Sequence, residues 1–530
     1  MAKGEKRKKV KSGFFRVIFS RTGLVFVLIL LQLALLLFGY YYLTIYKGIF
    51  YGIMITVSVL LVVYIHNSDS DPSFKMAWLI PILLAPAFGA FFYLFIHLQV
   101  GTKVIARRLQ KNYFDTSAFL EQDELVKKEL EIENPRVAGL AHYVKNYGGY
   151  PIYNGTGAKY YPFGEDVFED LKKDLRKAKK FIFLEFFIIE RGVMFDSILN
   201  ILREKVREGV EVRLMYDGTC SIMLVPYNFP SQVEKMGIKC KVFSQVRPFL
   251  STSQNNRDHR KIVVIDGHTG YTGGFNLADE YINVKHRFGV WKDTGVKING
   301  PAVKNMTIMF LQMWNVTGNE KEKYQDYILP DNHAYEFGYD RKGYVLPYGD
   351  SPLDKENIGK QVYIDIMNNS KKYIHIMTPY LILDSDTVCT LKYVAKRGVS
   401  VKIITPHIPD KKYVYYLAHS HYKDLISNGI EIYEYTPGFV HAKMFVSDDM
   451  KAVVGTINLD FRSLYLHWED AVYFYGNSVV HSVEKDFVET MASWPIVRWT
   501  VPRLGVAYAW ALLPFLYTRS KNRSDSLHEV

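Results

Sequence analysis

Cysteine is scarce in this chain of 530 residues, which contains only three, at Cys220, Cys240 and Cys389. They lie far apart, and no two have the short spacing that a thiolate metal site requires. The sequence therefore predicts neither a disulfide framework nor a cysteine-ligated zinc site. We expect the three cysteines to be packing residues.

Acidic residues are fewer than basic ones. The chain has 54 Asp and Glu against 66 Lys and Arg, which gives a formal net charge of +12. That balance favours an anionic partner, either nucleic acid or an acidic membrane surface. The 39 Tyr and 33 Phe suit membrane interfaces and also stack on nucleic-acid bases. Composition alone leaves both partners open.

Long hydrophobic runs gather near the N-terminus. After a basic tail at 1–21, apolar runs follow at about 23–46, 49–65 and 76–98. The first run is too long for a signal peptide, and no small-residue cleavage site follows it before the next run. We therefore expect residues 22–100 to form a membrane anchor of two to three hydrophobic helices, with buried core helices as the alternative.

The membrane topology has two conflicting signals. The basic tail favours a cytoplasmic N-terminus. A second basic cluster is also expected on the cytoplasmic side, and it comprises Lys103, Arg107, Arg108 and Lys111. Three full spans would put the tail and the cluster on opposite sides. One resolution is that the segment with Pro81 and Pro86 lies in the interface or re-enters. We expect a multi-pass membrane protein with its soluble part in the cytoplasm.

The remaining chain carries one motif twice. Residues 259–266 (HRKIVVID) and 441–448 (HAKMFVSD) both read H-x-K, four residues, D. Each is followed by Gly, a small residue, any residue and Asn, at 273–276 and at 455–458. A single copy is compatible with a half-buried histidine and a surface lysine. Two copies with matching tails are much harder to explain in that way.

The residue types of the motif suit chemistry on a phosphate. Side chains two apart on a strand face the same side, so His259 and Lys261 project together, as do His441 and Lys443. An ammonium group neutralises phosphate oxygens, and an imidazole can attack phosphorus or move a proton.

The carboxylates of the two motifs, Asp266 and Asp448, are expected to hold each imidazole in one tautomer. No carboxylate cluster of the kind that holds a metal is evident, and two lysines supply the positive charge that a cation would bring. We expect neither metal nor cofactor.

The soluble part contains an internal repeat, because residues 179–189 resemble 371–382 and residues 207–217 resemble 396–406. Strands that alternate with helices of this length predict an α/β fold with parallel or mixed sheets. A displacement at phosphorus needs a nucleophile and an acid on opposite sides, which favours one shared site over two separate ones. The expected segments are a connector at 101–150, a first half at 151–342, a linker at 343–354 and a second half at 355–500.

The chain ends in an apolar segment with basic flanks at 501–530. Its apolar stretch is too short to span a bilayer and contains Pro514. We expect an interfacial element on anionic lipid, with packing against the catalytic part as the alternative.

The duplicated motifs and their tails resemble the phospholipase D superfamily, and within it the bacterial cardiolipin synthases. Further similarity lies in residues 71–78 (DPSFKMAW), 291–295 (WKDTG) and 458–463 (NLDFRS), and in Glu469. The resemblance extends from Asp71 almost to the end of the second half. The chain departs from the family in an extra hydrophobic segment ahead of the usual two and in its apolar C-terminus.

The resemblance implies two α/β/α sandwich halves that share one active site. It implies phosphatidyl transfer between two phosphatidylglycerol molecules, which yields cardiolipin and glycerol. His259 would attack phosphorus and form a phosphohistidine, while His441 would protonate the departing glycerol and later activate the second lipid; the reverse division of roles stays open. Residues expected to hold the phosphoryl group are Lys261, Lys443, Asn276, Asn458, Gly274 and Thr456.

Several further residues have two interpretations each. Glu185 lies in an apolar strand, and its family position puts it near the active site, with a structural ion pair as the alternative. Tyr380 is a substrate-binding candidate on the same basis. His419 and His421 are two apart on an expected helix and so do not share a face, which favours solvated or pocket-rim roles over metal binding.

The expected partners are phosphatidylglycerol and anionic membrane lipids, and not nucleic acid, because much of the basic excess lies beside the membrane segments. Three rival functions stay open. They are a membrane-bound phospholipase D that releases phosphatidic acid, a phospholipase D-like nuclease, and a scaffold with relict motifs.

Overall fold

The computed structural model describes residues 30–31, 33–34, 37–38, 41–42, 47–68, 72–97, 100–244, 255–316, 323–330, 333, 335, 339–354 and 356–492. The basic tail at 1–21 and the C-terminal segment at 501–530 lie outside the described residues. Their expected roles stay predictions.

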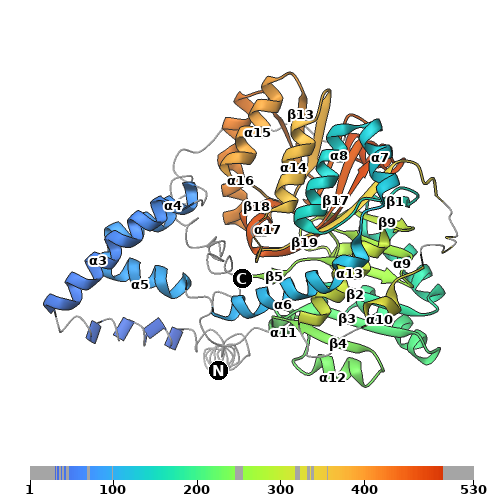
Figure 1. Cartoon of the computed structure of the whole chain (residues 1–530), viewed down its shortest axis with the longest axis horizontal. Coiled ribbons are helices and arrows are strands. Elements are labelled where there is room, and N and C mark those ends of the chain that lie inside the picture. Colours follow the sequence, from blue (N-terminus) through green and yellow to red (C-terminus); the bar gives the residue numbers. More distant parts are fainter. Residues whose placement is uncertain are drawn as a thin grey trace, which may run out of the picture.

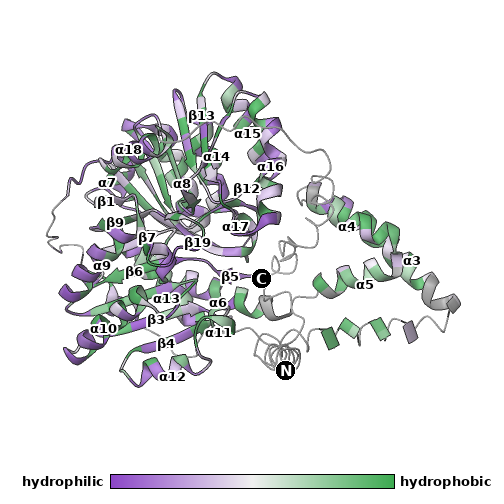
Figure 2. Cartoon of the chain, turned by 180° about the vertical axis from the view of Figure 1, so that it is seen from behind, coloured by the Kyte–Doolittle hydropathy of each residue, from purple (hydrophilic) through white to green (hydrophobic). Residues whose placement is uncertain are grey.

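An N-terminal arm of helices projects from the body of the molecule (Figure 1). It contains α3 (Lys47–His66), α4 (Pro72–Leu84) and α5 (Pro86–His97). Hydrophobic residues predominate along these helices (Figure 2). Within the described ranges, no helix meets both the length and the hydropathy expected of a membrane span. Membrane-spanning helices therefore stay a prediction.

A helical connector leads from the arm into the body. It comprises α6 (Val100–Thr116), η1 (Ser117–Leu120), α7 (Glu124–Glu133), α8 (Pro135–Tyr143) and the π-helical turn η2 (Val144–Gly148). The side chains of Asp123 and Asn134 cap α7 and α8 by accepting hydrogen bonds from the first free backbone N–H groups. Asn112 of α6 donates a 2.8 Å hydrogen bond to the backbone carbonyl of Gln312, which ties the connector to the first half.

The first half contains a mixed seven-stranded sheet in the order β1-β9-β7-β6-β2-β3-β4. Strands β2, β3 and β4 are parallel, whereas β6 runs antiparallel to both β2 and β7. The strands are β1 (Gly157–Tyr161), β2 (Phe181–Phe186), β3 (Glu211–Asp217), β4 (Lys239–Phe243), β6 (Lys261–Ile265), β7 (Thr269–Gly273) and β9 (Gly295–Asn299). The helices are α9 (Gly164–Lys177), α10 (Val193–Arg207), α11 (Cys220–Met223), α12 (Phe229–Glu234), η4 (Asp279–Ile282), α13 (Val303–Val316) and η5 (Tyr324–Tyr327).

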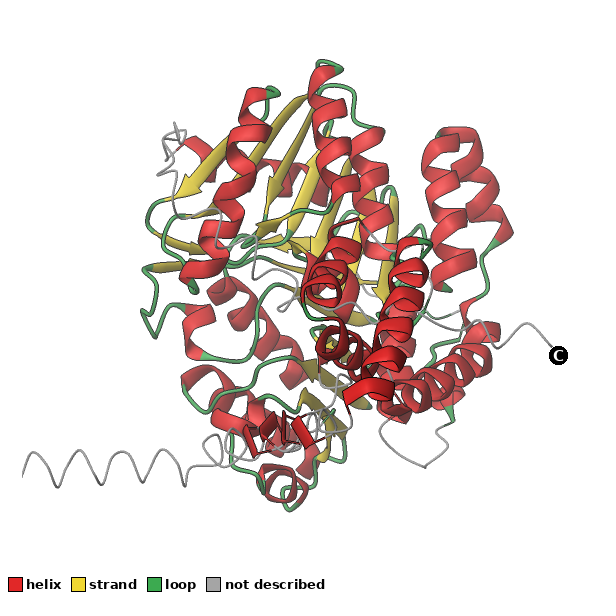
Figure 3. Cartoon of the chain, turned by 90° about the vertical axis from the view of Figure 1, so that its left-hand side faces the viewer, coloured by secondary structure: helices red, strands yellow, loops and turns green. Residues whose placement is uncertain are grey.

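The second half repeats this arrangement, with its sheet in the order β10-β19-β17-β16-β11-β13-β14. Its strands are β10 (Tyr344–Asp350), β11 (Tyr373–Met377), β13 (Ser400–Pro406), β14 (Glu431–Tyr435), β16 (Met444–Ser447), β17 (Lys451–Gly455) and β19 (His467–Tyr475). Its helices are α14 (Ile358–Asn368), α15 (Ser385–Lys396), α16 (Lys412–Ser427), α17 (Phe461–Leu466) and α18 (Val479–Ala492). A short pair of strands, β12 (Leu381–Ile382) and β18 (Leu459–Asp460), completes it. Helices cover the sheets (Figure 3), which confirms the predicted α/β fold of two similar halves.

The predicted linker at 343–354 is wrong over most of its length. Residues 344–350 form β10, an edge strand that pairs along its whole length with β19. Every residue of β10 is buried. Pro347 and Gly349 are residues typical of a linker. Both are tolerated here, because an edge strand needs only one of its two hydrogen-bonding sides.

The two halves exchange short strands immediately before each H-x-K motif. Strand β5 (Arg257–Asp258) of the first half pairs with the start of β19 in the second half. Strand β15 (Gly438–Val440) of the second half pairs with β8 (Val290–Lys292) of the first half. His259 and His441 follow β5 and β15 directly. The backbone of each motif is therefore held by the opposite half.

Asp266 and Asp448 close the far ends of the motif strands. Each has a left-handed backbone, with φ of 52° and 55°. The Asp266 carboxylate accepts hydrogen bonds of 2.7, 2.7 and 2.9 Å from the backbone N–H groups of residues 179–181. Asp448 does the same for residues 371–373, at 2.7, 2.8 and 3.0 Å. Both aspartates thus fix the turn that enters the neighbouring strand, β2 or β11.

Replacing Asp266 by Asn tests this structural role. The amide keeps the shape of the side chain, but its NH₂ group faces backbone donors and leaves some of them unpaired. We expect Asp266→Asn to lower the midpoint of thermal unfolding of the detergent-solubilised full chain by at least about 5 °C. Asp115→Asn, on an exposed residue of α6, serves as the control, and equal midpoints for the two variants would contradict the role.

Candidate active site

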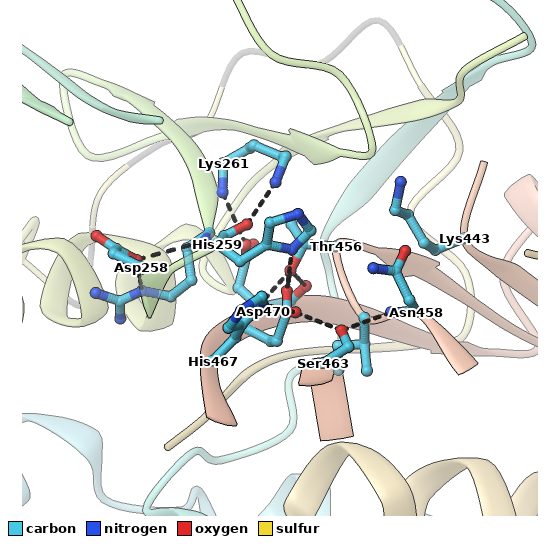
Figure 4. A network of polar contacts seen from close by, with 12 residues as sticks. Asp258, His259, Lys261, Lys443, Thr456, Asn458, Ser463, His467 and Asp470 are labelled. Carbon is cyan, nitrogen blue, oxygen red and sulfur yellow. Dashed lines mark hydrogen bonds and ion pairs between the residues drawn. The ribbon is translucent and has the colours of Figure 1, made fainter. Parts of the chain in front are cut away.

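His259 and Lys261 enter the site from the first half. His259 is buried, and its Nδ1 lies 2.8 Å from Oε2 of Glu469 in β19. The Lys261 ammonium donates to the backbone carbonyl of His259, and the Lys261 backbone N–H donates to Asp470 at 3.1 Å. Figure 4 shows these side chains beside Lys443 and Asn458, which come from the second half.

His441 and Lys443 enter the site from the second half. The Nδ1 of His441 lies 2.6 Å from Oδ2 of Asp293, which directly follows β8 in the first half. The Lys443 ammonium lies 2.8 Å from the same Nδ1 and also donates to the His441 carbonyl. The His441 ring packs among Tyr281, Trp291 and Phe439, with centroids 5.6, 5.3 and 5.9 Å away.

Each imidazole is therefore oriented by a carboxylate of the opposite half. His259 of the first half contacts Glu469 of the second, and His441 of the second half contacts Asp293 of the first. A carboxylate can only accept at Nδ1, which favours the proton on that nitrogen and leaves the lone pair of Nε2 for chemistry. In His441 this tautomer excludes a hydrogen bond from the Lys443 ammonium to Nδ1. The prediction that Asp266 and Asp448 set the tautomer is wrong, since both carboxylates are used by backbone N–H groups at the other end of the strand.

The small residues in the two motif tails hold these carboxylates in different ways. The Thr456 hydroxyl donates to Glu469 Oε2, and the Ser463 hydroxyl donates to Glu469 Oε1. At Gly274 there is no room for a side chain, because a Cβ would lie 2.0 Å from Asp293 Oδ1. Thr456 and Gly274 thus position the carboxylates, which is a more specific role than the predicted contact with substrate.

The two asparagines of the tails are not equivalent. The Asn276 side chain is used within the protein, because its Oδ1 accepts from Ile188 N–H at 2.9 Å and its Nδ2 donates to the Tyr281 hydroxyl at 2.7 Å. Asn458 donates from its backbone N–H to Ser463 Oγ, but its buried Oδ1 has no hydrogen-bond partner among the described residues. Of the pair, Asn458 is the one with side-chain capacity left for a ligand.

Burial and mutual repulsion lower the pKa values of the basic groups. Burial, followed by the nearby Lys443, lowers the pKa of His441 to about 4, and burial together with Lys261 and Lys443 holds the pKa of His259 well below its usual value. Burial also lowers the pKa of Lys261 to about 8 and that of Lys443 to about 7. Four basic groups packed together in this way form a site that favours a bound anion.

The remaining candidates have other contacts. Glu185 forms a buried ion pair with Arg260, which supports the structural alternative. The Tyr380 hydroxyl donates to Asp410 at 2.7 Å, and its ring packs 6.4 Å from that of Phe439, beside His441. His419 contacts the buried carboxylate of Glu434 at 2.8 Å. Tyr380 thus stays a candidate at the edge of the site.

The two imidazole partners, Asp293 and Glu469, lie within the segments that carry the family resemblance, but the sequence does not assign a role to either. A signal did exist, because each is a carboxylate among mostly apolar neighbours in the sequence, where an unpaired charge is rare if the segment is buried. The chain distance from His259 to Glu469 gives no hint that the two meet.

Comparison with known proteins gives two family matches. The family model described as "Cardiolipin synthase, PLD-like domain" matches residues 171–314 and 363–491, one segment in each half. The model described as "Phospholipase_D-nuclease N-terminal" matches residues 53–96, within the arm.

Several relatives are similar over most of their length. A cardiolipin synthase of Geobacillus kaustophilus is 32% identical over 447 residues, 83% of this chain and 87% of the relative. One of Alkalihalophilus pseudofirmus is 31% identical and covers 82% of this chain and 86% of the relative. An uncharacterised protein of Streptococcus mutans is 47% identical over 81% of this chain and 92% of its own.

One solved structure supports the fold. The phosphatidylserine synthase of Haemophilus influenzae superposes with a TM-score of 0.51 at 13% identity, over 71% of this chain and 96% of its own. At that identity the likeness concerns the fold alone.

Removing one of the crossed carboxylates tests their role. Glu469→Gln keeps the size of the side chain but no longer stabilises a charged imidazole or fixes its tautomer. We therefore expect the kcat of Glu469→Gln for a phospholipid substrate to be at least about a hundredfold lower than that of the wild type. Glu484→Gln is the matched control, because both oxygens of Glu484 lie 3.0 Å from the Nδ1 of His375 outside the site. Equal activity of the two variants would exclude a catalytic role for Glu469.

The lowered lysine pKa values predict an alkaline limit on activity. Below its pKa each ammonium is charged and attracts the phosphate, and above it the charge is lost. We expect kcat/KM for an anionic phospholipid to fall as the pH rises through the values of about 7 for Lys443 and about 8 for Lys261. A pH–rate profile checks this, and a rate that stays level across this alkaline range contradicts it.

Proposed function

Because this chain belongs to the family of phospholipase D-like cardiolipin synthases, we propose that it transfers a phosphatidyl group between two phosphatidylglycerol molecules. The products are cardiolipin and glycerol. The chain is a phosphatidyltransferase of the phospholipase D superfamily. The observation that carries the proposal is the convergence of two carboxylate-oriented imidazoles and two buried lysines from opposite halves.

In the proposed first step, Nε2 of His259 attacks phosphorus while the bond from phosphorus to the glycerol oxygen breaks. Glu469 stabilises the positive charge that develops on the imidazole. His441 gives a proton to the departing glycerol oxygen. The bound phosphate offsets the charges of Lys261 and Lys443, so the pKa of His441 rises from its value of about 4 once the substrate is in place.

In the second step, the neutral His441 removes the proton from a glycerol hydroxyl of the second phosphatidylglycerol. The new oxygen–phosphorus bond forms as the phosphohistidine bond breaks, which restores His259. Lys261, Lys443 and the side-chain NH₂ of Asn458 donate to the phosphoryl oxygens, and the ammonium groups stabilise their charge. The two like motifs also permit the reverse roles for the histidines.

We further propose that the arm anchors the enzyme in the bacterial membrane, with the catalytic part on the cytoplasmic side. Support comes from the hydrophobic surface of α3–α5 and from the contact of the arm with the site. Phe74 of α4 packs edge-on against Phe461 and Tyr465 of α17, at centroid distances of 5.2 and 6.0 Å. Helix α17 also carries Ser463, the partner of Glu469. A membrane-held arm would thus keep lipid substrates near the site.

Product analysis with labelled phosphatidylglycerol tests the function. We expect the wild-type enzyme in mixed micelles to form labelled cardiolipin and free glycerol. The variants His259→Asn and His441→Asn are expected to lose at least about a thousandfold in rate. Phosphate trapped on one histidine in the variant of the other would assign the nucleophile.

The rival that the site also accommodates is hydrolysis, because water can replace the second lipid at the same phosphohistidine. Labelled phosphatidic acid without cardiolipin would establish that rival and overturn the proposal. The control is His375→Asn, which replaces a buried histidine outside the site and should keep the rate of the wild type.

A further inference from the structure

A second imidazole lies beside His259 and has no part in the proposed mechanism. His467 is the first residue of β19, and its ring centroid lies 5.3 Å from that of His259 (Figure 4). Its Nε2 accepts a hydrogen bond of 3.1 Å from Arg462 Nε. Its Nδ1 is buried and has no hydrogen-bond partner among the described residues. The residue is 8% exposed, and the unused nitrogen is itself buried.

Glu469 lies between the two imidazoles. Its Oε2 is 2.8 Å from His259 Nδ1, and its Oε1 is 3.7 Å from His467 Nδ1. One ligand atom of each of the three residues lies within 4.8 Å of the other two, the only such group among the described residues. Two ligands of one zinc ion, each bound at about 2 Å, lie up to about 4 Å apart. Small side-chain rotations would therefore bring all three to bonding distance.

The donor set selects the class of ion. Two imidazoles and one carboxylate suit Zn²⁺ and similar borderline metals, with a fourth position left for water. Mg²⁺ and Ca²⁺ prefer oxygen ligands throughout. The neighbouring charges of Lys261 and Arg462 oppose a divalent ion, so the site suits one that binds reversibly.

We propose that His259, His467 and Glu469 form a binding site for a borderline divalent metal ion such as Zn²⁺, and that the bound ion inhibits the enzyme. Binding of the ion does not depend on the proposed function. Its inhibitory consequence does, because it requires that His259 act in the reaction.

Inhibition follows from the position of the proton on His259. In the metal-free site Nδ1–H faces Glu469, and the lone pair of Nε2 is available for chemistry. An ion at Nε2 occupies that lone pair directly. An ion at Nδ1 displaces the proton of that nitrogen. The neutral imidazole then carries its proton on Nε2, so the lone pair of Nε2 is again lost. Either mode of binding removes the reactive nitrogen.

Metal binding also moves the proton of His467 from one ring nitrogen to the other. Because Nε2 accepts from Arg462, the proton of the neutral ring is on Nδ1. Coordination through Nδ1 moves that proton to Nε2, so Arg462 must release the ring. Arg462 is half-buried and no ion pair fixes its guanidinium among the described residues, so it can turn toward solvent.

Co²⁺ binding to the resting full-length enzyme tests the site without any assay of activity. We expect visible absorption bands of a low-symmetry Co²⁺ complex that saturate at one ion per chain and disappear when Zn²⁺ is added. His467→Asn should weaken the binding at least about tenfold. The matched control is His421→Asn, which removes a half-buried imidazole from α16 and should leave the binding unchanged.

Inhibition is measured in the cardiolipin assay. We expect Zn²⁺ to inhibit the wild type, and Mg²⁺ and Ca²⁺ at the same concentration to have no effect. His467→Asn and His467→Gln should keep activity without metal and need at least about tenfold more Zn²⁺ for the same inhibition.

Two results overturn the inference. One is the absence of Co²⁺ bands in the wild type, a result that does not depend on how any variant folds. The other is equal Co²⁺ affinity of the wild type and the His467 variants. A wild type that binds Co²⁺ through His467 but forms no cardiolipin would retain the site and refute the proposed function. Cardiolipin formation that Zn²⁺ does not affect would support the proposed function and refute the inhibition by the bound ion.

Discussion

The contact between each imidazole and a carboxylate from the other half is the interaction on which the site depends. A histidine alone in this environment is a poor catalyst, because burial and two nearby ammonium groups disfavour its charged form. Glu469 and Asp293 offset that cost only if the halves are correctly docked. The strand pairs β5–β19 and β15–β8 secure this docking, since each ends one residue before a catalytic histidine candidate. Fold and chemistry are therefore linked at the same four side chains.

Which motif residues lie together follows from the sequence, whereas their carboxylate partners do not, for a physical reason. Alternation along a strand is local, so it correctly put His259 with Lys261 and His441 with Lys443. The same local reasoning assigned Asp266 to His259, although a strand of five residues carries the aspartate to its opposite end. The true partners are 210 and 148 residues away in the chain. Only the packing of the two halves brings them together.

Two other differences arise from the same limit. Pro347 and Gly349 indicated a linker, but the edge of a sheet accepts both, and β10 became the outermost strand of the second half. Gly274 and Thr456 looked interchangeable as small residues, yet one makes room for Asp293 and the other donates to Glu469. The repeat is visible in the sequence. The different roles of equivalent residues in its two copies depend on the side chains that pack against them, which the sequence does not show.

The exchanged strands also limit how substrates can enter. A protein of two halves often admits a ligand by a hinge motion that moves the halves apart, with the hinge at the linker. Here such an opening would break the ladders at β5 and β15 and pull both imidazoles off their carboxylates at once. A lipid must therefore arrive through local shifts of side chains and loops around a rigid centre. The same rigidity makes the site preorganised, because little reorganisation is left for the moment of reaction.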